Sequence, residues 1–126
     1  MAHGGNLYTI RYDQSINRIY INIEGDMSPP ESEKYIEEMY RTIEKTSIGF
    51  TVFADLSQCA PSVLENSANF EMVRNYASKY GVSGVVTLVS PQAFEAQRVN
   101  PVKGARNIFD SREAANKYLE LNAGQH

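Results

Sequence analysis

The chain has 126 residues, of which 42% are hydrophobic and 21% charged, and its formal net charge is -3. This length suits one domain with a single core, and the composition excludes a disordered chain. The twelve Lys and Arg residues are scattered along the sequence, which argues against nucleic-acid binding, because that function relies on clustered cations.

Few residues can supply metal or nucleophilic chemistry. Cys59 is the one cysteine, so it cannot form an intramolecular disulfide or a cysteine-based metal cage, and it fits a reducing compartment. His3 and His126 lie at the two ends, which leaves no internal histidine base or metal ligand. The start lacks an apolar signal core, and no run approaches the roughly 18 apolar residues of a membrane span. We expect a cytoplasmic protein with no membrane span, metal or cofactor.

Alternating residues predict an N-terminal β-hairpin. The period-two pattern covers residues 7–12, breaks at 13–17 and resumes over 18–24, where isoleucine occupies every second position. The other face of this second strand carries Arg18, Tyr20, Asn22 and Glu24. One face of the sheet is therefore expected to be wetter than the other.

Capping signals and apolar runs predict the remaining elements. Ser28-Pro29-Pro30-Glu31 begins a helix that runs to about residue 46. Further helices are expected after Ser62, from residue 90 to about 100, and after Asp110, where Asp110 is the expected cap. Short apolar runs at 50–54 and 85–89 predict two strands, the first ending at Asp55, and the segment 106–109 predicts a third, short strand.

This order predicts an α/β fold. A single domain over residues 7–121 is expected to contain a mixed, largely parallel sheet of about five strands, an antiparallel hairpin at its start and about four helices. Residues 1–6 and 122–126 are expected to be flexible ends. Ligands of such sheets bind beyond the carboxyl ends of the strands, where this sequence places residues 55–61, 90–94 and 110–112.

Three segments carry a family resemblance. They are Glu24-Gly25-Asp26 after the hairpin, Val52-Phe53-Ala54-Asp55-Leu56-Ser57, and Ile108-Phe109-Asp110-Ser111-Arg112-Glu113-Ala114-Ala115 leading to Tyr118-Leu119. In this order and spacing the chain resembles the STAS domain (sulfate transporter and anti-sigma-factor antagonist). It is most similar to the divergent SpoIIAA-like branch of short stand-alone bacterial proteins. The resemblance extends from Tyr8 to Leu119.

The resemblance implies a fold used for binding rather than for catalysis. Antagonists of the family carry an Asp-Ser-Ser-Gly turn whose serine is phosphorylated, and this chain has no such turn, although Ser62 and Ser67 bracket the place. The first hypothesis is a non-enzymatic regulatory or protein-interaction module in bacterial signalling, without the usual phosphoacceptor. The alternative is a small-molecule domain of the SpoIIAA/SEC14-like type that binds a lipid or an anionic ligand.

The candidate partner or ligand edge consists of Asp55, Ser57, Cys59, Ser62 and Ser67. Asp55 is either a base, metal ligand or hydroxyl acceptor, or a side chain that accepts from loop N–H groups. Cys59 is either a nucleophile or a half-buried loop thiol. Ser62 is a helix cap and, with Ser67, a possible phosphoacceptor. No catalytic residue is assigned, and a homodimer is a further possibility.

Tyrosines at helical spacing form the last candidate set. Tyr35, Tyr40, Tyr76 and Tyr80 are expected to pack on the sheet with their hydroxyls at its rim. The alternative is that some of them line a pocket or a dimer face.

Overall fold

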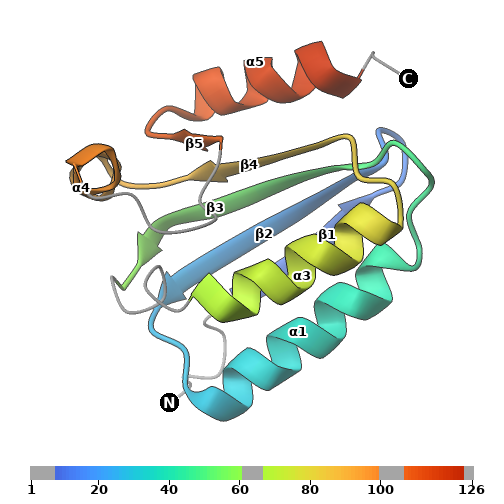
Figure 1. Cartoon of the computed structure of the whole chain (residues 1–126), viewed down its shortest axis with the longest axis horizontal. Coiled ribbons are helices and arrows are strands. Elements are labelled where there is room, and N and C mark those ends of the chain that lie inside the picture. Colours follow the sequence, from blue (N-terminus) through green and yellow to red (C-terminus); the bar gives the residue numbers. More distant parts are fainter. Residues whose placement is uncertain (1–7, 61–66, 100–106, 124–126) are drawn as a thin grey trace.

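The computed structural model describes residues 8–60, 67–99 and 107–123 (Figure 1). Within these ranges five strands and four helices follow one another in the predicted order. They are β1 (Tyr8–Asp13), β2 (Arg18–Gly25), α1 (Pro29–Ile43), β3 (Thr51–Cys59), α3 (Ser67–Lys79), β4 (Gly84–Leu88), α4 (Pro91–Val99), β5 (Ile108–Phe109) and α5 (Arg112–Ala123).

The strands form one mixed sheet in the order β1-β2-β3-β4-β5. β1 and β2 pair antiparallel as a hairpin, while β2, β3, β4 and β5 pair parallel to one another. This arrangement confirms the predicted α/β fold. Among the helices that the model describes, none combines the length and the apolar character that a membrane crossing requires.

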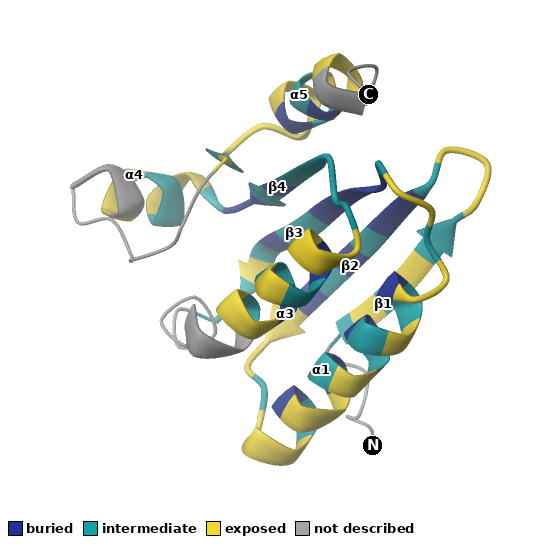
Figure 2. Ribbon diagram, turned by 45° about the vertical axis from the view of Figure 1, so that its right-hand side comes forward, coloured by how far each residue is buried: buried dark blue, intermediate teal, exposed yellow. Residues whose placement is uncertain are grey.

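Helices cover the two faces of the sheet unequally. α1 and α3 lie side by side on one face, and α5 lies on the opposite face, where it contacts β3, β4 and β5 (Figures 1 and 2). The first face buries the alternating isoleucines of β2 against Tyr35, Met39 and Ile43 of α1. On the second face, Ala115 and Leu119 of α5 pack with buried residues of β3 and β4. β1 and the polar side of β2 therefore lie beyond the strands that α5 contacts.

The sequence predicts the N-terminal cap of α1 correctly but not that of α5. Ser28 and Glu31 form the predicted capping box, since each side chain accepts from the other residue's backbone N–H. The cap of α5 is Ser111, whose hydroxyl oxygen accepts from the Ala114 N–H at 3.3 Å, and not the predicted Asp110. The helix begins one residue later than Asp110 would allow as its cap. Ser62 lies outside the described residues.

α1 ends at Ile43, before the predicted residue 46. The following N–H groups bond to carbonyls only three residues back, from Lys45 to Thr42 at 3.0 Å and from Thr46 to Ile43 at 3.1 Å. The Thr46 hydroxyl also donates to the Ile43 carbonyl at 2.6 Å. These bonds close the last turn and satisfy carbonyls that would otherwise lack a partner at the helix end.

β3 is longer than predicted. It continues through Asp55 to Cys59 because its second half pairs with the end of β2, placing Gln58 opposite Glu24 and Cys59 opposite Gly25. One extra residue on β3 shifts the register between Asn22 and Glu24, as in a β-bulge. Asp55 and Ser57 therefore lie within the strand, and not beyond its end as the sequence suggested.

Candidate functional site

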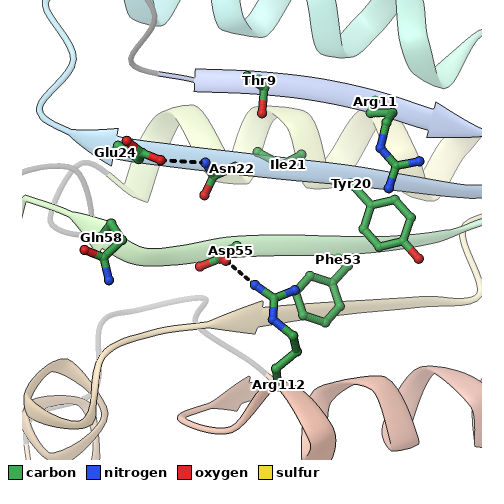
Figure 3. Close-up of a pocket in the computed structure, with 10 residues that line it drawn as sticks. All are labelled: Thr9, Arg11, Tyr20, Ile21, Asn22, Glu24, Phe53, Asp55, Gln58 and Arg112. Atoms are coloured by element: carbon green, nitrogen blue, oxygen red, sulfur yellow. Dashed lines mark hydrogen bonds and ion pairs between the residues drawn. The ribbon is translucent and has the colours of Figure 1, made fainter.

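A groove of about 500 Å³ lies on the α5 side of the sheet, over β1, β2 and β3 (Figure 3). Its floor is formed by the strands, and the first residue of α5 forms part of one wall. The lining residues are Thr9, Arg11, Tyr20, Ile21, Asn22, Glu24, Phe53, Asp55, Gln58 and Arg112. Seven of these ten side chains are polar or charged and two carry aromatic rings, so the groove can combine hydrogen bonds with ring contacts to a ligand.

The strand register arranges the floor as two rows that cross the sheet. Arg11 lies opposite Tyr20, which lies opposite Phe53, and these three form the aromatic row. The polar row consists of Thr9, Asn22 and Asp55, paired in the same way. Directly opposed side chains on neighbouring strands lie about 5 Å apart, so each row presents a continuous set of groups to the groove.

Each ring of the aromatic row is in contact with an arginine, Tyr20 with Arg11 and Phe53 with Arg112. The Arg11 guanidinium carbon lies 4.4 Å from the centre of the Tyr20 ring, and that of Arg112 lies 5.1 Å from the centre of Phe53. The two rings are 6.0 Å apart and tilted by 40°. Both cations are therefore held by ring faces, which attract positive charge.

Asp55 is occupied on both carboxylate oxygens. Oδ1 accepts from the Ser57 N–H at 3.0 Å and from the Ser57 hydroxyl at 2.6 Å. Oδ2 pairs with Arg112 Nη2 at 2.5 Å, and the Asp55 side chain is 16% exposed whereas that of Arg112 is 57% exposed. Farther along the floor, the Asn22 amide donates to Glu24 at 3.1 Å. The carboxylates of the groove thus already have partners within the protein.

The predicted edge is only partly assembled. Asp55 and Ser57 lie together, but Cys59, at the end of β3, packs with the core cluster that includes α1 and α3. Burial, followed by the nearby Asp55 charge, raises the pKa of the Cys59 thiol to about 11. Ser62 is outside the described residues, and Ser67 begins α3 with no described side-chain environment. The phosphoacceptor prediction therefore remains a prediction.

Sequence reasoning missed most of the groove. The alternating polar face of residues 18–24 and the placement of residues 110–112 beyond a strand were the available signals. Nothing in the sequence showed that α5 would bring Arg112 to Asp55, or that β1 would add Thr9 and Arg11 beside them. Within the described ranges, no group of three or more His, Cys, Asp or Glu residues could hold a metal ion.

The tyrosines separate into two environments. Tyr35 is buried and makes edge contacts with the rings of Tyr8 and Phe70, as predicted for a core residue. Tyr40 and Tyr76 instead stack on each other at 4.2 Å, and Tyr80 lies 5.0 Å from Tyr76. Tyr40 and Tyr76 thus join α1 to α3, and Tyr76 also packs against the core cluster, as predicted. Tyr80 lies directly after the end of α3 and is exposed.

Comparisons with known proteins support the fold. No family model and no curated protein matches the sequence. The structure is similar to that of an uncharacterized protein of the DUF3478 family with a SpoIIAA-like fold, from Shewanella loihica PV-4. The TM-score is 0.61 at 12% sequence identity, and the match covers 94% of this chain and 98% of that one. The chain therefore has a SpoIIAA-like α/β fold, which confirms the fold that its sequence resembled.

Proposed function

We propose that this protein is a non-enzymatic binding module that holds a small polar ligand in the groove over β1, β2 and β3. The observation that carries the proposal is the pair of rows on the groove floor, in which an arginine lies over each ring of the aromatic row. Ligand sites typically combine a volume of about 300–1,000 Å³ with a few convergent polar groups, and the volume of this groove lies in that range.

The state of the reactive groups supports binding rather than catalysis. A thiol with a pKa of about 11 is protonated near neutral pH, and Cys59 packs with the core cluster rather than lining the groove. Asp55 already accepts from Ser57 and pairs with Arg112. A general base must be within hydrogen-bond reach of the proton that it removes, and Asp55 would first have to give up one of these partners.

Native mass spectrometry tests this proposal. The folded protein is dialysed against a small-molecule extract of the cells that encode it, and a defined added mass is expected. Thr9→Trp places a large ring in the groove and should abolish the added mass, whereas Lys34→Trp, exposed on α1, should retain it. The released molecule should be chemically unchanged. A bare protein mass, or equal loading of Thr9→Trp, would overturn the proposal.

A second candidate function is a regulatory module that binds a protein partner. It is favoured by a partly exposed aromatic stripe, which we define as Met72 and Tyr76 of α3, Tyr80 directly after α3, and Tyr40 of α1. Met72 is 48% exposed, and the stripe is extended by Ile48, which is 83% exposed and lies against Gly81. Met and Tyr are enriched in the cores of protein interfaces, so this surface is suited to a partner.

One groove variant and one stripe variant distinguish the two candidate functions. If a protein partner binds the aromatic stripe, affinity capture from native cells should recover it with the wild type and with Thr9→Trp, but not with Tyr80→Asp. Circular dichroism establishes that each variant remains folded. Capture that is unaffected by Tyr80→Asp, or the absence of a specific partner, would exclude the stripe as the binding surface.

A further inference from the structure

We infer that the ligand of the groove is a small organic anion, a carboxylate or phosphate ester with hydroxyl groups on its body, and that Arg11 binds its charged group. This inference rests on the proposed function, because it names the chemistry of the ligand that the groove holds. It depends on three observations: the partners of the charged groups, the groups next to Arg11, and the polarity of the lining.

Arg11 differs from the other charged residues around the groove in its hydrogen-bond and ion-pair partners. Arg112 is paired with Asp55, and Glu24 accepts from Asn22. Asp13, two residues from Arg11 on the same strand face, accepts from the backbone N–H and the hydroxyl of Ser15. Arg11 contacts the Tyr20 ring. It also interacts electrostatically with Asp13, whose pKa is lowered by the Ser15 hydroxyl and, to a smaller extent, by Arg11, but no ion pair joins Arg11 to a carboxylate in the described part of the chain.

This arrangement leaves the donors of Arg11 available. A guanidinium has five N–H donors in a planar fork that matches a carboxylate or phosphate. The contact with Tyr20 holds the cation in place through the ring face and uses none of these donors in a hydrogen bond to an anion. A ligand anion can therefore bind to Arg11 without competing with a carboxylate, whereas the positive charge of Arg112 is already paired with Asp55.

The neighbours of Arg11 suit hydroxyl groups on the same ligand. Thr9 points into the groove from the same strand, and Asn22 lies opposite Thr9 in the register (Figure 3). The Asn22 amide nitrogen donates to Glu24, which leaves its carbonyl oxygen as an acceptor. A hydroxyl group can donate to that oxygen and accept from Thr9. An apolar body would leave these groups without partners, which is unfavourable.

A titration followed by amide nuclear magnetic resonance tests the inference with four probes. Glycerol 3-phosphate and gluconate carry both an anionic group and hydroxyls, inorganic phosphate carries the charge alone, and glycerol carries the hydroxyls alone. We expect the first two to shift the amide signals of Thr9, Arg11 and Asn22 at the lowest concentrations. Phosphate should bind more weakly, and glycerol should produce no saturable shift.

Variants of Arg11 test whether this residue binds the anionic group of the ligand. Arg11→Gln should weaken the binding of glycerol 3-phosphate by about tenfold or more, as expected for a charge-assisted hydrogen bond. Arg11→Lys, which keeps the charge but loses the fork, should have an intermediate affinity. Arg41→Gln is the matched control, because Arg41 is exposed on α1 and pairs there with Glu37. The amide spectrum itself reports whether each variant is folded.

The outcomes distinguish this inference from the proposed function. Binding of glycerol as tight as that of glycerol 3-phosphate, or anion binding that survives Arg11→Gln, would overturn the role of Arg11 and leave the groove as a ligand site. If no probe shifts the groove while native mass spectrometry finds a bound molecule, the ligand class is wrong and the proposed function stands. If phosphate alone binds as tightly as its ester, the anion site is supported and the hydroxyl contacts are not.

Discussion

Arg112, the first residue of α5, pairs with Asp55 of β3 across 57 positions of sequence, and its guanidinium lies over the ring of Phe53. The pair joins the beginning of the last helix to the middle of the sheet. It also fixes one wall of the groove, because both residues line it. Arg112 thus links the packing of α5 to the shape of the candidate site.

We expect Arg112→Gln to lower the free energy of unfolding by about 1 kcal/mol. The estimate combines a partly exposed ion pair, worth about 0.2–1 kcal/mol, with an exposed cation–π contact, worth about 0.5–1 kcal/mol. Urea denaturation followed by circular dichroism measures the change. Arg41→Gln, which removes the exposed pair with Glu37 at 3.7 Å, should cost less than about 0.5 kcal/mol. Equal losses in the two variants would mean that the Phe53 contact and the partial burial of Asp55 contribute nothing.

Two neighbouring residues compete for the role of the α5 cap, and the structure assigns it to Ser111. Ser111→Ala should therefore lower the free energy of unfolding by about 1 kcal/mol, the typical cost of losing a cap. Asp110→Ala should change it by less than about 0.5 kcal/mol, as for an ordinary surface position. Thermal or urea unfolding of both variants checks the assignment. A larger loss in Asp110→Ala would restore the cap that the sequence alone suggested.

The sequence predicts those elements whose signals are local. Period-two alternation located the hairpin, and the Ser28 capping box located α1, because both depend on residues close together in the chain. The end of β3 was missed because strand continuation through Gln58 depends on pairing with the distant Glu24. The cap of α5 was missed because Asp110 and Ser111 are both good caps. Tertiary packing decides between such local alternatives.

The groove illustrates the same limit. Asp55 and the segment containing Arg112 were both expected at the carboxyl ends of strands, and the structure brings the two side chains together. The sequence alone could not place Arg11 beside them. The hairpin pattern predicts that β1 pairs with β2, but it does not predict which strand pairs with the other edge of β2. Only the parallel pairing of β2 with β3 puts Tyr20 between Arg11 and Phe53.

The most buried cation of the described residues is Arg18, which is 8% exposed and donates from Nε to the Thr51 hydroxyl at 2.9 Å. Thr51 lies opposite it in the register and is 1% exposed. Thr51→Val keeps the shape but removes the acceptor, so we expect a loss of about 1–3 kcal/mol in the free energy of unfolding. The double variant Arg18→Met with Thr51→Val should lose less than the sum of the two single changes.

Thr42 provides the control for this pair, because its side chain is less buried than that of Thr51. The Thr42 hydroxyl donates to the Glu38 carbonyl within α1 and is only half-buried. Thr42→Val should therefore change the free energy of unfolding by less than about 0.5 kcal/mol. Urea denaturation of the wild type and of the four variants gives the comparison. Strict additivity in the double variant would show that Arg18 does not depend on the Thr51 hydroxyl.

Cys59 is expected to react slowly with iodoacetamide in the folded protein. Burial raises the pKa of its thiol from 9.0 to about 11, and each unit lowers the thiolate fraction about tenfold at a given pH below both values. Labelling near pH 8, followed by mass spectrometry, should therefore be roughly a hundredfold slower than in urea-unfolded protein. Equal rates would indicate an accessible thiol with an ordinary pKa and would contradict this expectation. Labelling that is faster in the folded protein would reveal an activated thiol and would revive the nucleophile that the sequence left open.

The stability of the protein should fall on the alkaline side. Burial raises the pKa of Tyr35, and the hydrogen bond from the Tyr76 hydroxyl to Glu44 is the largest cause that raises the pKa of Tyr76. The folded state therefore holds both phenolic protons more tightly than the unfolded state does. This contribution is fully present below the ordinary tyrosine pKa of about 10 and is lost as the pH rises from that value through the folded-state pKa.

Two variants assign the alkaline loss to these tyrosines. Tyr35→Phe removes an ionisable phenol, so the free energy of unfolding should decline less between about pH 9 and about pH 11 than in the wild type. Glu44→Gln removes the charged acceptor of the Tyr76 hydrogen bond. The pKa of Tyr76, followed by nuclear magnetic resonance, should therefore move down toward the ordinary tyrosine value. Urea denaturation at each pH gives the stability curve. A wild-type curve that stays level across this range would contradict both assignments, because an upward shift in the folded state requires the unfolded state to lose its protons first.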